Sequence, residues 1–440
     1  MVVGTERICN SLSENQAKPF IYSPVGLDLK SKGGILAKYE PQARWLLNCI
    51  HYVRVTRNLD VDEYVNLNTD LLAKVMGRRN TVSVVRGACL DAGLIEIDNH
   101  YIKGEKSLGH RLGPVLQDRQ WHRHEIKGAV FAKQVERYKT HIRSKDSLTE
   151  DVHLYLSNWA NQVGWTEDMP TVLESVSKVK PVARGQVDII NDGMMHYSVC
   201  QYGRFHSNYT GLVSELRSCL QINGEKLREI DVVSSQPYHL ACLLMDEGKS
   251  QTRPKDKIHL NPDLVTQITQ NAKNPKKTIN QNQLNSLSPP PLPYEYLFSG
   301  REDLGSFVSD VLTGNLYERI QQAGGFETRS QAKEHFFHAV YGNHGLNLKT
   351  IGLLYPSVAK SILALKKAKG YKWLPCEMQR RESKVMIGRA CRRLMADYSH
   401  IPIVTVHDSI LTTAEHLETV KEIILQAHAA NVIQPKLRIK

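Results

Sequence analysis

The most constraining stretch of the sequence is Ile401–Thr413, which reads IPIVTVHDSILTT. Apolar and β-branched residues flank the polar triplet His407-Asp408-Ser409, and this pattern predicts a strand, a tight turn and a returning strand. An aspartate at the tip of such a turn is held stiffly but stays reachable by water or a metal ion. Taken alone, the segment also fits a surface hairpin in which Asp408 only forms an Asx turn.

A second aspartate, Asp231, lies in a comparable setting far upstream. Residues 227–237 read LREIDVVSSQP, so Asp231 lies within an apolar, strand-like run, and Pro237 opens a helix-like stretch that reaches Met245. Two carboxylates on adjacent strand ends can hold a pair of divalent cations, the arrangement that two-metal phosphoryl transfer requires. The alternative is a pair of unrelated aspartates in separate turns.

A predicted helix lies between the two aspartates, where residues 329–342 read RSQAKEHFFHAVYG. Its residues Arg329, Lys333, Phe337 and Tyr341 recur at intervals of four and therefore share one face. The two cations can hold a triphosphate, the arginine as a bidentate fork and the lysine as a point charge. An amphipathic helix with a cationic start is the alternative, but cations at a helix N-terminus cost about 0.3–1 kcal/mol each.

These stretches, in this order, resemble the polymerase group that joins family A DNA polymerases with the single-subunit RNA polymerases of bacteriophages and mitochondria. VHDS resembles the third catalytic motif of that group, DVVSSQP resembles the first, and residues 329–342 are similar to the nucleotide-contacting helix between them. Gly203-Arg204 is similar to a Gly-Arg signature that precedes the first carboxylate. The resemblance covers about residues 195–415 and does not extend to the first 190.

The resemblance implies an α+β fold of the right-hand polymerase type, with an antiparallel palm sheet, reduced helical fingers and a helical thumb. It implies template-directed nucleotidyl transfer in which Asp231 and Asp408 are catalytic and bind two Mg²⁺ ions, with Mn²⁺ as the alternative ion. The nucleotide-binding residues are then Arg329, Lys333, Phe337, Tyr341, Gly342 and Gln236, and the primer- or template-binding residues are Gly203, Arg204, His407 and Arg217.

Three positions bear on the sugar of the product, and they disagree. The resemblance places Gln236 where the DNA polymerases carry a bulky glutamate and the RNA polymerases a small residue. Phe337 falls where the DNA enzymes have an aromatic residue, whereas Ser409 matches the RNA branch. Two positions against one favour a DNA product, with a single-subunit DNA-directed RNA polymerase as the alternative.

The N-terminal part contains a different pattern, which predicts a winged helix-turn-helix over residues 41–115. A helix-like segment at 68–76 precedes the turn GRRN, a second helix at 81–92 and two strands around a basic loop. A small helical domain with solvated basic residues is an alternative of equal weight. The DNA-binding residues expected here are Arg78, Arg79 and Arg86, which line the recognition helix from the turn onward, and Lys103, Lys106 and Arg111 on the wing.

Domain boundaries follow from these patterns and from the chain length. A single core seldom grows beyond ~250 residues, so the 440 residues predict two to three domains. We expect an N-terminal arm at 1–40, the winged helix at 41–115, a helical, basic, thumb-like region at 116–190, and the palm and fingers at 191–440. Residues 273–293 are polar and proline-rich, which predicts a flexible loop.

The charge balance suits a polyanionic partner, because 57 Lys and Arg against 45 Asp and Glu give a net charge of +12. The expected partners are a DNA template with a DNA or RNA primer or product, nucleoside triphosphates, and accessory replication or transcription proteins. The eight cysteines show no CxxC pair, which predicts free thiols in a reducing compartment. No apolar run or leader pattern indicates a membrane segment, so a cytoplasmic location is expected.

A non-enzymatic alternative remains open at this stage. In it, the chain is a DNA-binding replication initiator or regulator whose polymerase-like domain is degenerate. The presence of both aspartates together with Arg329, Lys333 and Tyr341 argues against degeneration.

Overall fold

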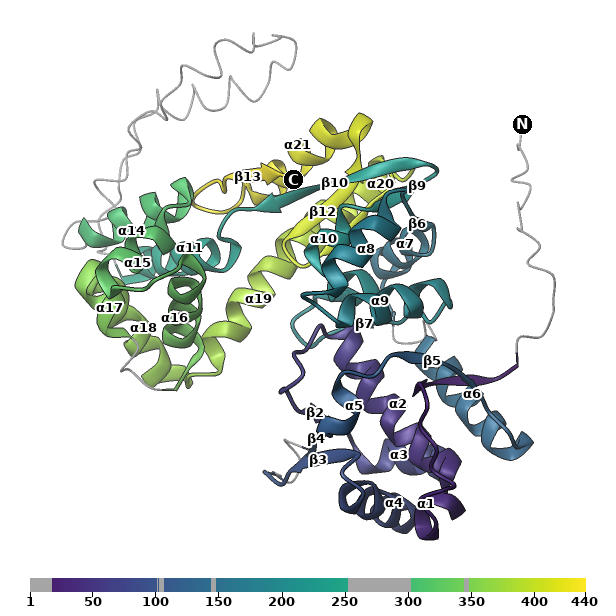
Figure 1. Ribbon diagram of the computed structural model, residues 1–440. Coiled ribbons are helices and arrows are strands. Elements are labelled where there is room, and N and C mark those ends of the chain that lie inside the picture. The colour runs from purple at the N-terminus through teal and green to yellow at the C-terminus, as the bar shows by residue number, and fades with distance from the viewer. Residues whose placement is uncertain (1–17, 101, 103–106, 144–147, 252–301, 344–347) are drawn as a thin grey trace, which may run out of the picture. The chain divides into compact units, whose positions relative to one another are not determined.

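The computed structural model describes residues 18–100, 102, 107–143, 148–251, 302–343 and 348–440. The chain forms two compact units, shown with their elements in Figure 1. Unit 1 comprises 1–199, 205–227 and 402–406, and unit 2 comprises 200–204, 228–401 and 407–440. The predicted loop at 273–293 and the wing residues Lys103 and Lys106 lie outside the described residues.

The first part of unit 1 combines three helices with a small antiparallel sheet in the strand order β2-β4-β3. The side chain of Asn68 accepts hydrogen bonds from the backbone N–H groups of Asp70 and Leu71, which caps the second of these helices. Helices and sheet share one apolar core. The elements are α2 (Glu40–Thr56), β2 (Val65–Asn66), α3 (Thr69–Met76), α4 (Arg79–Asp91), β3 (Ile95–Asp98) and β4 (Gly109–Leu112).

Strands occur within the two segments of unit 1 that the sequence predicts as an N-terminal arm, 1–40, and as a helical, basic region, 116–190. Strand β1 (Phe20–Pro24) is buried throughout and pairs antiparallel with β5 (Trp121–Glu125). The remaining elements are α1 (Gly34–Lys38), α5 (Pro114–Gln117), α6 (Ala129–Arg143), α7 (Asp151–Ala160), β6 (Val163–Trp165), α8 (Met169–Ser177), α9 (Val182–Asn191), β7 (Tyr197–Val199), β8 (Phe205–Ser207), η1 (Asn208–Thr210), α10 (Ser214–Arg217), β9 (Leu220–Ile222) and β11 (Val404–Val406).

Unit 2 combines a short antiparallel pairing with a set of packed helices. The end of β10 (Glu225–Val232) pairs with β13 (Leu437–Ile439), with Asp231 opposite Arg438. Buried residues of α11, α14 to α19 and the segment before β13 form one hydrophobic core. The other elements are α11 (Ser235–Gln251), α14 (Glu302–Thr313), α15 (Leu316–Gly324), α16 (Arg329–Tyr341), α17 (Leu348–Leu354), α18 (Pro356–Lys369), α19 (Trp373–Val385), the π-helical turn η4 (Met386–Cys391), α20 (Arg392–Asp397), β12 (Ser409–Thr413), η5 (Ala414–His416) and α21 (Leu417–His428).

Two residues of unit 2 separate neighbouring helices. Gly314, whose φ of 87° is outside the helical region for L-residues, separates α14 from α15. Pro356 begins α18 and separates it from α17. In the described part of the chain, no helix is long and apolar enough to cross a lipid bilayer.

Candidate active site

The two predicted catalytic aspartates come from adjacent backbone segments of unit 2. Asp231 is the penultimate residue of β10, and Asp408 lies in the turn that precedes β12. The backbone N–H of Val232 donates to the carbonyl oxygen of Asp408 at 3.3 Å. The strand, turn and strand predicted over 401–413 are present as β11, residues 407–408 and β12.

The backbone turns sharply next to each aspartate. His407 has a φ of 52° and Ser234 a φ of 53°, so both non-glycine residues adopt the left-handed region. That region is uncommon for such residues and is tolerated where the surrounding structure holds it in place. The turn at His407 therefore fixes the backbone position from which the side chain of Asp408 projects.

The carboxyl of Asp408 lies in an electrostatically unfavourable position for an anion. Burial, followed by the nearby carboxylates of Glu382 and Asp231, raises its pKa to about 7, and Arg204 opposes part of this shift. Asp231 is buried, and its Oδ2 accepts from Arg438 Nη2 at 2.8 Å and lies 3.1 Å from Lys440 Nζ. The ionised form of Asp408 is therefore disfavoured, while two cations contact the carboxylate of Asp231.

This donor set fits a hard divalent cation. The two aspartates offer carboxylate oxygens, which Mg²⁺ prefers, and a bound cation would offset the charge that raises the pKa of Asp408. Among the described residues, no group of three or more His, Cys, Asp or Glu side chains has an arrangement that could hold a metal ion. The set therefore provides two protein carboxylates and leaves the other coordination positions to water and phosphate oxygens, as is usual for Mg²⁺.

A residue that the sequence did not single out, Glu382 of α19, is the centre of the hydrogen-bond network next to the aspartates. Its side chain is buried at 1% exposure. Oε1 accepts from Arg204 through Nη2 at 2.6 Å and Nε at 2.8 Å, while Oε2 accepts from Ser235 Oγ at 3.0 Å and from Gln236 Nε2 at 2.5 Å. The only sequence signal for this residue is a carboxylate in the helix that leads to the 401–413 hairpin.

The structure brings two predicted nucleotide-site residues into contact. The hydroxyl of Tyr341, the last residue of α16, donates to Gln236 Oε1 at 3.0 Å. Burial, followed by the carboxylates of Glu382 and Asp408, raises the pKa of Tyr341, so its hydroxyl stays protonated. Gln236 therefore connects Tyr341 to Glu382.

The predicted helix over 329–342 is present as α16. Thr328 and Gln331 form a capping box, which explains why it begins at Arg329. Arg329 pairs with Glu318 on α15 at 2.5 Å, which gives this cation a partner that the sequence did not predict. Lys333 is exposed, with its ammonium 6.0 Å from the ring of Phe337.

Two predicted glycines have identifiable local roles. Gly342 ends α16, and a Cβ there would lie 2.6 Å from the carbonyl oxygen of His338. The buried Lys366 donates to the carbonyls of Ala339 at 2.6 Å and Gly342 at 2.7 Å. Gly203 has a φ of 81°, so it allows the turn that presents Arg204.

The predicted DNA-contacting residues of unit 1 differ in their accessibility. Arg78 is exposed at the start of α4, and the neighbouring Arg79 pairs with Asp70. Arg86 is buried and donates to Thr69 Oγ1, and this burial lowers its pKa. The side chain of Arg86 therefore faces the core instead of a phosphate-accessible surface.

The two remaining arginines of unit 1 hold local structure. Arg111 pairs with Glu96 across β3 and β4, and Arg217 at the end of α10 donates to the carbonyl of Leu212 at 3.1 Å.

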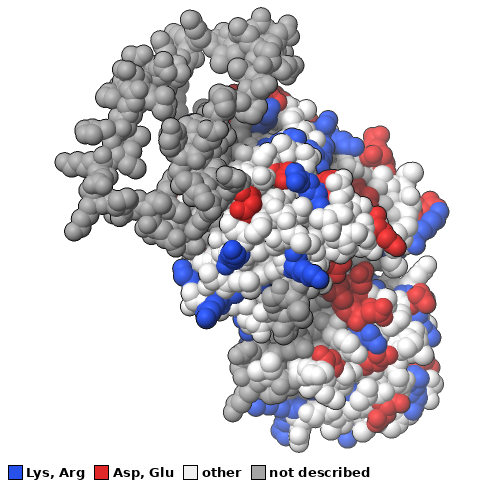
Figure 2. Space-filling view, turned by 90° about the vertical axis from the view of Figure 1, so that its left-hand side faces the viewer, with Lys and Arg blue, Asp and Glu red and all other residues white. Residues whose placement is uncertain are grey.

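Figure 2 shows Lys and Arg side chains as separate spots among uncharged and acidic ones on the face it draws. On that face the net positive charge does not gather into one continuous patch.

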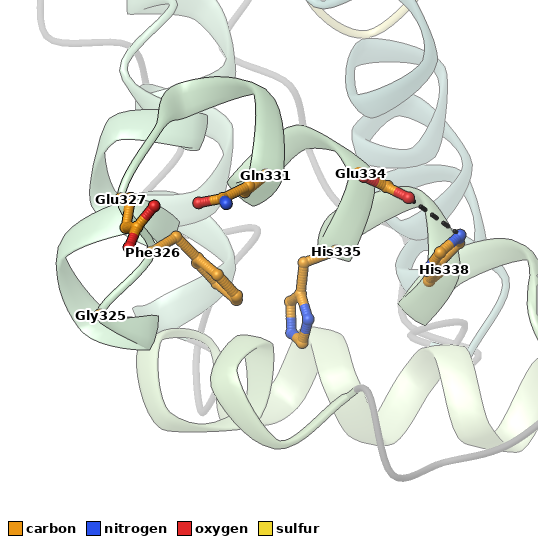
Figure 3. A pocket seen from close by; sticks show the side chains of 7 residues that line it. All are labelled: Gly325, Phe326, Glu327, Gln331, Glu334, His335 and His338. Carbon is orange, nitrogen blue, oxygen red and sulfur yellow. Dashed lines mark ion pairs between the residues drawn. The ribbon is translucent and has the colours of Figure 1, made fainter.

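An open pocket of about 440 Å³ lies against the opposite side of α16 from the Arg329–Tyr341 stripe. Figure 3 shows its lining side chains, among them the ion pair of Glu334 and His338 at 3.8 Å. None of the residues predicted for nucleotide binding lines this pocket.

Comparisons with known proteins provide little direct information. No protein-family model and no curated protein matches the chain. Among solved structures, the chain is similar to the POL domain of Pol1 from M. smegmatis in complex with DNA primer-template and dNTP. The identity is 10%, the match covers 89% of this chain and 80% of that chain, and the TM-score is 0.29.

Proposed function

We propose that the chain is a template-directed nucleic-acid polymerase that extends a 3′-hydroxyl with nucleoside triphosphates, using a DNA template. The single observation that carries this proposal is the pairing of Asp231 and Asp408 on hydrogen-bonded backbone, where burial and the nearby carboxylates of Glu382 and Asp231 raise the pKa of Asp408 to about 7. In this proposal unit 2 contains the palm and the reduced fingers.

The two aspartates would hold two divalent cations. When bound, these ions make the 3′-hydroxyl a better nucleophile and neutralise charge on the leaving pyrophosphate. The protein's part is to hold both carboxylates rigidly in place, and a bound cation would offset the effects that oppose the ionisation of Asp408. The hydrogen bond between Val232 N–H and the Asp408 carbonyl and the strained turn at His407 support that rigidity.

Helix α16 would bind the nucleotide. Arg329 and Lys333 hold the triphosphate, and Phe337 and Tyr341 pack against the base and sugar. Arg329 must exchange Glu318 for phosphate, which costs little because both side chains are about half exposed and such pairs contribute roughly 0–1 kcal/mol. Gln236 lines the sugar, and Gly203, Arg204 and His407 contact the primer or template.

Unit 1 would bind DNA through a winged helix. The order α2, β2, α3, α4, β3, β4 and the sheet order β2-β4-β3 support this assignment. Of the candidate contacts, the exposed Arg78 is the best placed, and Arg86 is the least accessible.

Primer extension tests the proposal. The protein is incubated with primed and unprimed DNA templates, Mg²⁺ and either dNTPs or rNTPs. We expect extension of the primed template with dNTPs and its loss in Asp408→Ala. Extension with rNTPs alone would make the chain a DNA-directed RNA polymerase, and tight DNA binding without extension under any condition would favour a DNA-binding initiator or regulator.

A further inference from the structure

We infer that Glu382 is a positioning residue that locks the side chain of Gln236 and thereby makes the site select deoxyribonucleotides over ribonucleotides. This inference rests on the proposed polymerase function and adds a residue to it. Glu382 would not touch the nucleotide, because its effect passes through Gln236.

The contacts of Glu382 explain why it is not itself a metal ligand. A buried carboxylate is costly unless charged and polar partners compensate it. Here Arg204 donates to Oε1 through two nitrogens, and Ser235 and Gln236 each donate to Oε2. Both oxygens are therefore engaged by protein donors, whereas at Asp231 the cations Arg438 and Lys440 contact the same oxygen, Oδ2.

The same contacts fix the orientation of the Gln236 amide. An amide side chain has a donating NH₂ end and an accepting oxygen, and only the hydrogen-bond network decides which end faces which neighbour. The ionised carboxylate of Glu382 can only accept hydrogen bonds. Its Oε2 therefore accepts from the NH₂ group of Gln236, with an Nε2–Oε2 distance of 2.5 Å. The oxygen must then face Tyr341, whose hydroxyl donates to it at 3.0 Å.

A glutamine anchored at both ends cannot swing aside to admit an additional hydroxyl. In the proposed function Gln236 lies beside the sugar, so a 2′-hydroxyl would have to break one of its two hydrogen bonds. Gln236 is half-buried, so leaving one of its polar groups without a partner has a free-energy cost. Discrimination between the sugars therefore depends on Glu382 holding the far end of this side chain.

The test exchanges the two side chains. In Glu382→Gln, the carboxylate that can only accept is gone, so the Gln236 amide can present either end to Tyr341, and in Gln236→Glu, two carboxylates face each other; each single variant therefore loses the fixed pair. The double variant restores it, because the amide introduced at position 382 can donate to the carboxylate introduced at position 236, and that carboxylate still accepts from Tyr341. We expect the dNTP-to-rNTP preference to fall about tenfold in each single variant and to recover in the double variant.

The readout is the ratio of incorporation efficiencies for a dNTP and its matching rNTP. Because Glu382 also raises the pKa of Asp408, its removal changes the metal site and the overall rate. Both substrates use that same metal site, so the ratio cancels this effect. Glu377→Gln is the matched control, since Glu377 is on the same helix and pairs with Arg381 at 3.2 Å. Its preference should stay unchanged.

The outcomes separate this inference from the proposed function. An active wild type whose sugar preference is unchanged in both single variants, or is not restored in the double variant, overturns the role of Glu382 alone. A wild type that extends no primer overturns the polymerase proposal and the inference with it. If Glu382→Gln does not fold, Tyr341→Phe removes the anchor at the other end of Gln236 and must also lower the preference, and an unchanged preference there overturns the inference.

Discussion

Asp408 is the residue on which the proposed chemistry depends most directly. Burial and the carboxylates of Glu382 and Asp231 oppose its ionisation, so the folded protein holds this charge at a cost. Such a cost is typical of functional sites, where unfavourable charge is retained because a ligand offsets it.

Replacing Asp408 with asparagine should therefore separate stability from ion binding. We expect Asp408→Asn to be at least as stable as the wild type in the absence of divalent ions, because it removes one of the crowded charges. Mn²⁺ should raise the melting temperature of the wild type but not of the variant. Thermal denaturation in EDTA and in MnCl₂ measures both effects.

Asp397→Asn is the control for this prediction. Asp397 is exposed at the end of α20 and pairs only locally with Arg393, four residues earlier at 3.6 Å. This variant should keep the Mn²⁺ response. A Mn²⁺ response that survives in Asp408→Asn would contradict the assignment of Asp408 as a ligand.

A buried histidine of unit 2 predicts a pH dependence of stability. Burial, with His428, Arg381 and Arg204, lowers the pKa of His239 from 6.5 to about 3. Because the unfolded chain binds this proton near pH 6.5 and the folded chain only near pH 3, the stabilisation is complete above pH 6.5 and is lost as the pH falls toward 3.

The variant His239→Leu removes this proton uptake. Its free energy of unfolding should fall less than that of the wild type between about pH 7.5 and about pH 4.5, by on the order of a few kcal/mol. Urea unfolding at the two pH values measures the difference, with the exposed His400→Leu as a control. Equal pH slopes for His239→Leu and the wild type would contradict the prediction.

At the scale of elements, adjacent aromatic residues of α16 separate folding from nucleotide binding. Phe336 is buried at 1% exposure in the core of unit 2, whereas Phe337 is only partly buried beside Tyr341. We expect Phe336→Ala to destabilise the protein by about 3–5 kcal/mol. Phe337→Ala should cost less stability but raise the KM for the nucleotide.

Chemical denaturation and nucleotide titrations of primer extension distinguish the two variants of α16. Each variant is the matched control of the other, since the residues are neighbours of identical chemistry. An unchanged KM in Phe337→Ala would remove the predicted stripe from the nucleotide site.

Strand β13 places a cation against Asp231, and this contact predicts an effect on ion affinity. The Arg438 side chain is 60% exposed, and such pairs contribute about 0.2–1 kcal/mol. Removing the Arg438 side chain makes the site more negative, so the variant Arg438→Ala should bind Mn²⁺ up to roughly fivefold more tightly. Titration calorimetry checks this, with Lys436→Ala as control because Lys436 donates to the Thr313 carbonyl. Weaker binding in Arg438→Ala would contradict the prediction.

Elements whose formation depends on residues close together in the chain were predictable from the sequence. The turn around Asp408 and helix α16 follow from β-branched flanks, a capping box and a four-residue repeat. The pairings of β1 with β5 and of β10 with β13 were not predictable, because their partners lie about a hundred or more residues apart. Such pairings depend on tertiary packing that local propensity does not encode.

The same limit applies to the site. The two aspartates could be singled out because each lies in or beside an apolar, strand-like run. Glu382 could not, because a carboxylate in a charged helix, RRESK, is typical of a solvated face. Its burial and its link to Arg204, 178 residues away, emerge only in three dimensions.

At the scale of the whole molecule, the two compact units match a division of labour between DNA binding and catalysis in the proposed function. The residues assigned to chemistry, from Arg204 to Asp408, all belong to unit 2, although they span half of the chain. In the proposed function, catalysis therefore depends on two aspartates, distant in sequence, that act as one site.

Single-turnover primer extension by the wild type, Asp231→Asn, Asp408→Asn and the double variant tests this claim most directly. Residues that act as a unit have strongly non-additive effects. We predict that each single variant extends the primer about a thousandfold or more slowly than the wild type. The double variant should be no slower than the less active of the two single variants. Small, independent losses that multiply in the double variant, or full activity in either single variant, would contradict the account.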